Sequence, residues 1–176
     1  TQTYEDVLAA MDQKGYELTL PEVGTVCQLG EAAFTIVAPC GEYGDNANDY
    51  SVGILLEHGE NRFLFTGDAE EDAENDMLGS GIDLSADVFK AAHHGSSTAN
   101  TEAFLEQVNP EYVVISCGEG NSYGHPHAEV MNRLRELGIQ VFRTDEQGTV
   151  VATSDGSSIS FNVPASESWK AGEPVG

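Results

Sequence analysis

The stretches FTGD (65–68) and AHHGS (92–96) decide how this chain folds. An apolar run precedes each of them, at 63–65 and 88–92, and each run predicts a buried β-strand. Each strand therefore delivers a metal-competent side chain at its carboxyl end, where a rigid sheet passes into a loop. A third cluster, GHPH (124–127), follows the apolar run at 112–116. One carboxylate and four imidazoles at three strand ends indicate a metal site.

The order of the expected elements predicts the fold class. Apolar periodicity predicts helices over 4–14, 69–78, 101–108 and 128–137. It predicts strands over 26–29, 33–37, 50–57, 62–65, 88–92, 112–116, 140–143, 149–153 and 158–163. Because strands and helices alternate in the second half, we expect an α/β fold with a mixed β-sheet covered by helices. Residues 164–176 are rich in Pro, Gly, Ser and Glu, which predicts a flexible linker or tail after a domain over 1–163.

Four motifs, taken together and in order, resemble one known family. TGD (66–68), KAAHHGS (90–96), YGHPH (123–127) and RTD (143–145) resemble the second half of a metallo-β-lactamase-fold domain of the ComEC-like competence branch. The similarity runs from about residue 18 to about residue 163. The resemblance implies an αββα sandwich, of which this chain supplies one half. That family opens with a His-x-(His/Asp)-x-Asp-His motif, and none of the five histidines lies in one. We therefore expect a fragment that lacks the first half of the domain.

The resemblance also implies metal ligands. A carboxylate at Asp68 can bridge two metal ions, although an acidic helix follows and Asp68 is equally placed to cap its amino terminus. Side chains of adjacent residues leaving a strand point in opposite directions, so one of His93 and His94 is expected to reach the same metal. The resemblance favours His94 as that ligand, and His93 would then either support the metal ligands from behind or contact the substrate.

Ser96, His125 and His127 are the residues expected on the substrate side. A helix is predicted to begin just after His127, and a helix amino terminus attracts anions. A histidine there can donate to a phosphate or protonate a leaving alkoxide, and Ser96 can offer its hydroxyl. The alternative is that His125 packs within its loop and His127 is a first-turn residue. His58, in a predicted hairpin turn, is expected to be structural.

The resemblance implies a hydrolase that uses Zn²⁺ or Mn²⁺, dinuclear in the complete domain, to cleave a phosphodiester. Because few ligands remain, we expect the fragment itself to be weakly active or inactive. The substrate implied by the family is single-stranded DNA. The formal charge of −23, from 30 acidic and 7 basic residues, weakens that reading and favours a smaller phosphodiester such as a cell-wall polymer. The alternative function is a non-catalytic interaction module of a secreted multidomain protein.

Composition sets the remaining expectations. A chain of 176 residues with 40% hydrophobic content suits one globular domain, and no apolar run approaches the roughly 18 residues of a membrane span. The acidity favours an extracellular or cell-surface location. Cys27, Cys40 and Cys117 match no metal-binding spacing, so they are free thiols, or Cys27 pairs with Cys40 in an oxidising compartment. Half a sandwich leaves apolar sheet surface uncovered, which predicts self-association.

Overall fold

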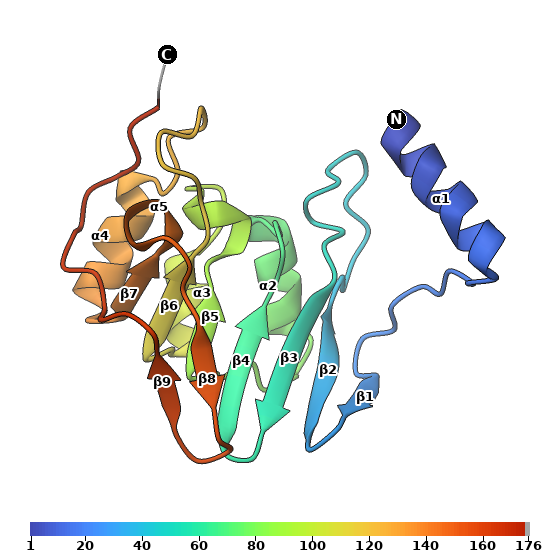
Figure 1. The fold of residues 1–176 in the computed structure, drawn as a ribbon, viewed down its shortest axis with the longest axis horizontal. Helices are drawn as coiled ribbons and strands as arrows, with labels where there is room; N and C mark the ends of the chain where they lie inside the picture. The colour runs from blue at the N-terminus through green and yellow to red at the C-terminus, as the bar shows by residue number, and fades with distance from the viewer. Residues whose placement is uncertain (175–176) are drawn as a thin grey trace.

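The computed structural model describes residues 1–174 and is built on a seven-stranded sheet in the order β1-β2-β3-β4-β5-β6-β7 (Figure 1). Strands β1 to β4 pair antiparallel, and β4 to β7 pair parallel. The predicted α/β class with a mixed sheet is confirmed. The strands are β1 Val26–Leu29, β2 Ala32–Ala38, β3 Gly53–His58, β4 Asn61–Phe65, β5 Val88–Lys90, β6 Tyr112–Ile115 and β7 Gln140–Arg143.

Three helices cover one face of the sheet: α2 (Glu71–Gly79), α3 (Glu102–Val108) and α4 (Ala128–Glu136). The core lies between them and the strands, because apolar side chains on the inner face of each helix meet every second residue of β3 to β7. Helix α1 (Gln2–Lys14) stands apart from the sheet and has no buried residue. A short helix that was not expected, α5 (Thr144–Gln147), follows β7.

The opposite face of the sheet is covered only in part within residues 1–174. The hairpin of β8 (Ala152–Ser154) and β9 (Ile159–Phe161) lies over the β5–β7 side, where the Phe161 ring stacks on Phe142 with centroids 3.8 Å apart. His58 Nδ1 lies 2.9 Å from Ser154 Oγ and so ties the hairpin to the end of β3, in keeping with a structural role for this histidine.

Over β1 to β4 the same face remains open. Residues paired across these strands place their apolar side chains side by side on it, as the pairs Phe34–Leu56 and Leu56–Phe63 show. A hollow of about 470 Å³ lies there. It is lined by Leu29, Glu31, Ala32, Leu56, His58, Phe63, Phe65, Ala152 and Ser154.

The segment after residue 163, expected to be a flexible linker, makes specific contacts along the body. Ser166 N–H donates to the Val141 carbonyl at 2.7 Å, and Gly172 N–H donates to the Pro126 carbonyl at 2.8 Å. Trp169 packs against the core. Residues 175 and 176 lie outside the described residues, and the domain boundary at 163 stays a prediction.

Candidate functional site

The predicted site residues lie together at the carboxyl ends of β4, β5 and β6. They line one cavity of about 610 Å³, although each arrives from a different part of the chain. Parallel strands end on the same edge of a sheet, so the three loops that leave β4, β5 and β6 converge there. The cavity is lined by Asn48, Asp68, His93, His94, Ser96, Thr98, Tyr123, His125 and His127.

Asp68 is placed by a tight turn directly after β4. Gly67 has φ of +60°, and a Cβ there would lie 2.8 Å from the Ser51 side chain, so the close approach requires glycine. Ser51 Oγ in turn accepts the Asp68 N–H at 3.0 Å. The capping position of α2 is Glu70, two residues later, so the alternative reading of Asp68 as that cap is wrong.

The two adjacent histidines do not leave a strand. Strand β5 ends at Lys90, and a tight turn over Ala92–Gly95 follows, so the strand predicted through residue 92 is shorter than expected. His93 and His94 have φ of +45° and +57°, a left-handed conformation that costs non-glycine residues roughly 1–3 kcal/mol each. Their directions are therefore set by this turn and not by the alternation of a strand.

A buried hydrogen-bond network holds the turn in this conformation. The Asn100 side chain, 1% exposed, accepts the Ala92 N–H at 2.9 Å and donates to the carbonyls of Ala92 and Ser96. Glu74, fully buried on α2, accepts the N–H groups of Asn100 and Thr101 at 2.6 and 2.9 Å. Burial raises the pKa of Glu74, although these bonds oppose the shift. Hydrogen bonds made by Glu74 on α2 and by Asn100, just before α3, thus offset the backbone strain at His93 and His94.

His94 is oriented as a metal-ligating histidine would be. Its Nδ1 lies 2.6 Å from the Ser116 carbonyl, which can only accept, so Nδ1 carries the proton. The lone pair is then on Nε2, 3.5 Å from Asp68 Oδ1. The Ser116 carbonyl shares a peptide group with the Cys117 N–H, and that N–H donates to Thr144 Oγ1, at the start of α5, at 2.9 Å. The Thr144 hydroxyl in turn donates to the Cys117 carbonyl at 2.7 Å, so the peptide is held in place.

His93 is paired with Glu70, a residue that the sequence analysis did not single out. Glu70 Oε1 lies 3.0 Å from His93 Nδ1 and accepts the Thr98 hydroxyl at 2.7 Å. Burial raises the pKa of Glu70, but hydrogen bonds from Thr98, Asn46 and Asn48 outweigh it and lower the pKa overall. A carboxylate at Nδ1 leaves His93 Nε2 available in the cavity. The sequence signal was the position of Glu70 two residues after Asp68, hidden in an acidic run that reads as a solvated helix start.

His125 is the most buried of the site histidines, at 6% exposed. Its ring lies 5.6 Å from that of His93, 6.2 Å from His94 and 4.7 Å from His127. Burial, followed by repulsion from these three imidazoles, lowers the pKa of His125 to about 4. At neutral pH it is uncharged and can donate one N–H to an anion, but holds no extra proton for a leaving group.

His127 and Ser96 are already engaged within the protein. His127 Nδ1 accepts the Ser97 N–H at 2.9 Å, and Nε2 lies 3.1 Å from the Tyr123 carbonyl. Ser96 is 3% exposed and its hydroxyl lies 3.0 Å from that of Thr98. Both residues border the cavity, and a role toward substrate would require one of these bonds to open.

The donor set fits a metal only in part. Asp68 and His94 offer one oxygen and one imidazole nitrogen of the kinds that Zn²⁺ and Mn²⁺ accept. Across residues 1–174, however, no three His, Cys, Asp or Glu side chains are grouped so as to hold an ion together. Asn48 and Ser51, before β3, carry neither an imidazole nor a carboxylate, so they add no strong ligand.

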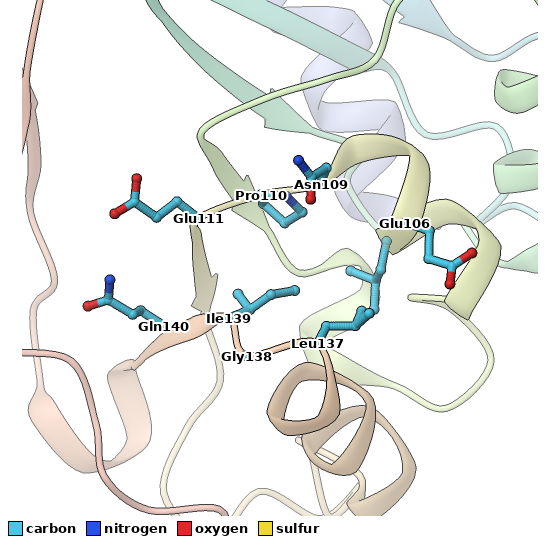
Figure 2. A pocket seen from close by; sticks show the side chains of 9 residues that line it. Glu106, Asn109, Pro110, Glu111, Leu137, Gly138, Ile139 and Gln140 are labelled. Carbon is cyan, nitrogen blue, oxygen red and sulfur yellow. The ribbon is translucent and has the colours of Figure 1, made fainter.

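A second hollow lies at the opposite ends of the strands, where α3 and α4 end and β6 and β7 begin (Figure 2). It encloses about 220 Å³. Its only ionisable side chains are Glu106 and Glu111, and Figure 2 shows both turned outward. It has no imidazole, thiol or paired carboxylate, so the chemistry points to the histidine cavity.

Comparisons with known proteins agree with this architecture. The family model described as "Metallo-beta-lactamase superfamily" matches residues 7–119, more than half of the chain. The chain therefore belongs to the metallo-beta-lactamase superfamily. The matched region includes Asp68, His93 and His94 and ends before His125 and His127.

Three known proteins that are similar to this chain carry informative names, one of them for competence and one for recombination. ComE operon protein 3 of Bacillus subtilis (strain 168) is 33% identical over 146 residues, which cover 83% of this chain and 19% of that protein. Competence protein ComA of Neisseria gonorrhoeae is 36% identical over 118 residues, 66% of this chain and 17% of the relative. Recombination protein 2 of Haemophilus influenzae is 37% identical over 117 residues, 66% of this chain and 15% of the relative. The chain thus spans less than a fifth of the length of these relatives. Among residues 1–174 the structure contains no helix long and apolar enough to cross a membrane.

Proposed function

We propose that this chain is part of a metal-dependent hydrolase that cleaves phosphodiesters. The observation that carries the proposal is the geometry at Asp68 and His94. A carboxylate oxygen and an imidazole lone pair face each other at 3.5 Å. The imidazole is oriented by its Nδ1 contact with the Ser116 carbonyl, and the backbone that carries the carboxylate is held by Ser51 Oγ. Such support from neighbouring groups is typical of ligands that must be held ready for an ion.

In this proposal, Asp68 and His94 hold Zn²⁺ or Mn²⁺ together with ligands that this chain does not supply. The metal, when bound, lowers the pKa of a water and neutralises charge on the phosphate. His93 Nε2, with Glu70 behind its ring, is the group best placed to move a proton at the reacting oxygen. Neutral His125 donates a hydrogen bond to a phosphate oxygen. Ser96 and His127 shape the wall of the cavity.

The name of Recombination protein 2 supports a nucleic-acid phosphodiester, and the charge of −23 supports a smaller one, such as that of a cell-wall polymer. The same acidity supports an extracellular or cell-surface location. With two protein ligands, the chain 1–176 is expected to bind metal weakly and to turn over slowly or not at all.

Calorimetric titration of the chain with Mn²⁺ and Zn²⁺, beside hydrolysis of bis(p-nitrophenyl) phosphate, tests the proposal. We expect affinity weaker than micromolar, reduced at least tenfold in Asp68→Asn and in His94→Gln. His58→Gln is the matched control, because His58 is also partly buried and hydrogen-bonded but lies at the far end of the sheet. Sub-micromolar binding with turnover would contradict the expected weakness of the fragment. Metal binding that is unchanged in both site variants would overturn the assignment and favour a non-catalytic interaction module.

A further inference from the structure

Tyr123 is a large aromatic side chain exposed at the rim of the candidate site. It lines the cavity with Asp68 and the histidines, yet it is 76% exposed. Leaving an aromatic ring this open to water forgoes the burial that normally holds it in a core. An exposed aromatic beside convergent polar groups is the usual composition of a ligand site.

The Tyr123 ring is supported on one side and free on the other. It stacks on His125, with centroids 5.6 Å apart and planes inclined by 15°. Because His125 is buried, it forms a fixed floor beneath the tyrosine. The high exposure of Tyr123 then belongs to the remaining face and the edges of its ring. A flat ligand can stack there without displacing any protein group.

The loop that carries Tyr123 is rigidly built. The Asn121 side chain accepts the His125 N–H at 3.0 Å and donates to the carbonyls of Gly118 and His125 at 2.9 and 2.7 Å. The Tyr123 carbonyl accepts a hydrogen bond from His127 Nε2 at 3.1 Å. The ring therefore stands on a preorganised backbone, which lowers the entropy lost when a ligand is ordered.

We propose that Tyr123 determines substrate specificity by stacking on a nucleobase of a single-stranded nucleic acid. The inference rests on the proposed function, since the stacked base is the one next to the phosphodiester held at Asp68 and His94. With only seven Lys and Arg in the chain, counterion release contributes little, and stacking is the remaining source of affinity. A polyol-phosphate polymer of a cell wall has no planar ring to place on Tyr123.

Fluorescence anisotropy of the full 176-residue chain tests this without relying on turnover. The probes are a labelled oligothymidylate and an abasic oligonucleotide with the same number of phosphates, each measured with EDTA and with Mn²⁺. We expect the chain to prefer the base-bearing probe by roughly 5- to 100-fold, the range that one stacked base accounts for. Tyr123→Ala should abolish the preference, and Tyr123→Phe should keep it. Tyr16→Ala is the matched control, since Tyr16 is 66% exposed but does not line the cavity.

Equal affinity for the two probes, or no binding of either, would overturn the inference. So would competition by a glycerol-phosphate polymer that depends on Tyr123. A base preference that vanishes in Tyr123→Ala, in a chain whose metal binding is unchanged in Asp68→Asn and His94→Gln, would support the stacking role while counting against the proposed hydrolase.

Discussion

The histidines of this site differ from one another through their partners. His94 faces a carbonyl with Nδ1, His93 faces a carboxylate with Nδ1, and both nitrogens of His127 are bound. Of these three, His94 and His93 therefore keep an Nε2 that makes no hydrogen bond within residues 1–174, whereas His127 does not. These partners, more than the number of imidazoles, distinguish the three roles in the proposed site. His94 is suited to ligate a metal, His93 to carry a proton, and His127 to form the wall of the cavity.

The Glu70–His93 pair leads to a prediction about tautomers. With Glu70 in place, neutral His93 should carry its proton on Nδ1. In Glu70→Ala, with no carboxylate at that nitrogen, the ring should shift toward the Nε2-protonated form and its signals should broaden. Imidazole ¹⁵N spectra at alkaline pH measure this directly. Glu71→Ala is the control, because Glu71 is an exposed neighbour, and the ion pair with His93 belongs to Glu70. An unchanged His93 spectrum in Glu70→Ala would count against a positioning role.

His125 leads to a prediction about pH. Its pKa is lowered from the ordinary value near 6.5 to about 4, so between these values the folded chain binds fewer protons than the unfolded chain. The contribution of the neutral ring to the unfolding free energy is fully present above the pKa that His125 has in the unfolded chain. It is lost as the pH falls toward 4. Between pH 7 and pH 4, metal-free protein should lose roughly 3 kcal/mol more unfolding free energy than His125→Gln. Urea denaturation at both pH values measures the difference, and parallel losses in the two proteins would refute the assignment.

At the level of elements, the site depends on how α2 and α3 hold the turn after β5. Glu74 and Asn100 form that support, and neither lines the cavity. Their hydrogen bonds connect the helix layer to the histidine turn. A substitution in the core can therefore alter the positions of the histidines even though the substituted residue does not line the cavity.

Asn100→Ala should destabilise the fold by about 2–4 kcal/mol, since it removes three buried hydrogen bonds and places alanine at φ of +58°. Asn109→Ala is the matched control: Asn109 has φ of +48° but is exposed at the end of α3, so about 1 kcal/mol is expected. Chemical denaturation compares the two. Equal losses would show that the hydrogen bonds of Asn100 contribute little.

The sequence predicted the strand ends well and the turn poorly, for physical reasons. The apolar runs before Asp68 and His125 are local signals, and they placed the motifs at the correct edge of the sheet. The left-handed backbone at His93 and His94 depends on Asn100 and on Glu74 from another helix, which no local pattern reveals. Glu70 was missed because an acidic residue at a helix start is ordinarily read as solvated.

At the level of the whole molecule, the layers are unequal. One face of the sheet is covered by three helices, whereas the other is covered only over β5 to β7 within residues 1–174. Burying the open apolar surface would be favourable by about 25 cal/mol per Å². Strand β1 is also an edge of the sheet, so both the face and the edge can accept another copy of the chain.

We therefore predict that the chain 1–176 self-associates through the face of β1 to β4. Leu29 is 60% exposed at the end of edge strand β1 and lines the hollow, so Leu29→Lys places a charge on the open surface and should shift the population to monomer. Leu20→Lys is the control, since Leu20 is 93% exposed in the segment before β1 and does not line the hollow. Sedimentation velocity over a range of concentrations measures the distribution. A wild-type chain that remains monomeric at high concentration would refute the prediction.

Gly172 packs closely against the loop that carries His125, so the point at which the chain is shortened affects that loop. A Cβ at Gly172 would lie 2.2 Å from the His125 carbonyl, while Arg143 binds the Lys170 carbonyl and Trp169 rests on the core. Residues 169–172 are thus a brace behind the wall of the cavity, although none of them lines it. A shortened chain that ends before Trp169 would retain every residue of the site and lose the support that keeps His125, and the tyrosine stacked on it, in place.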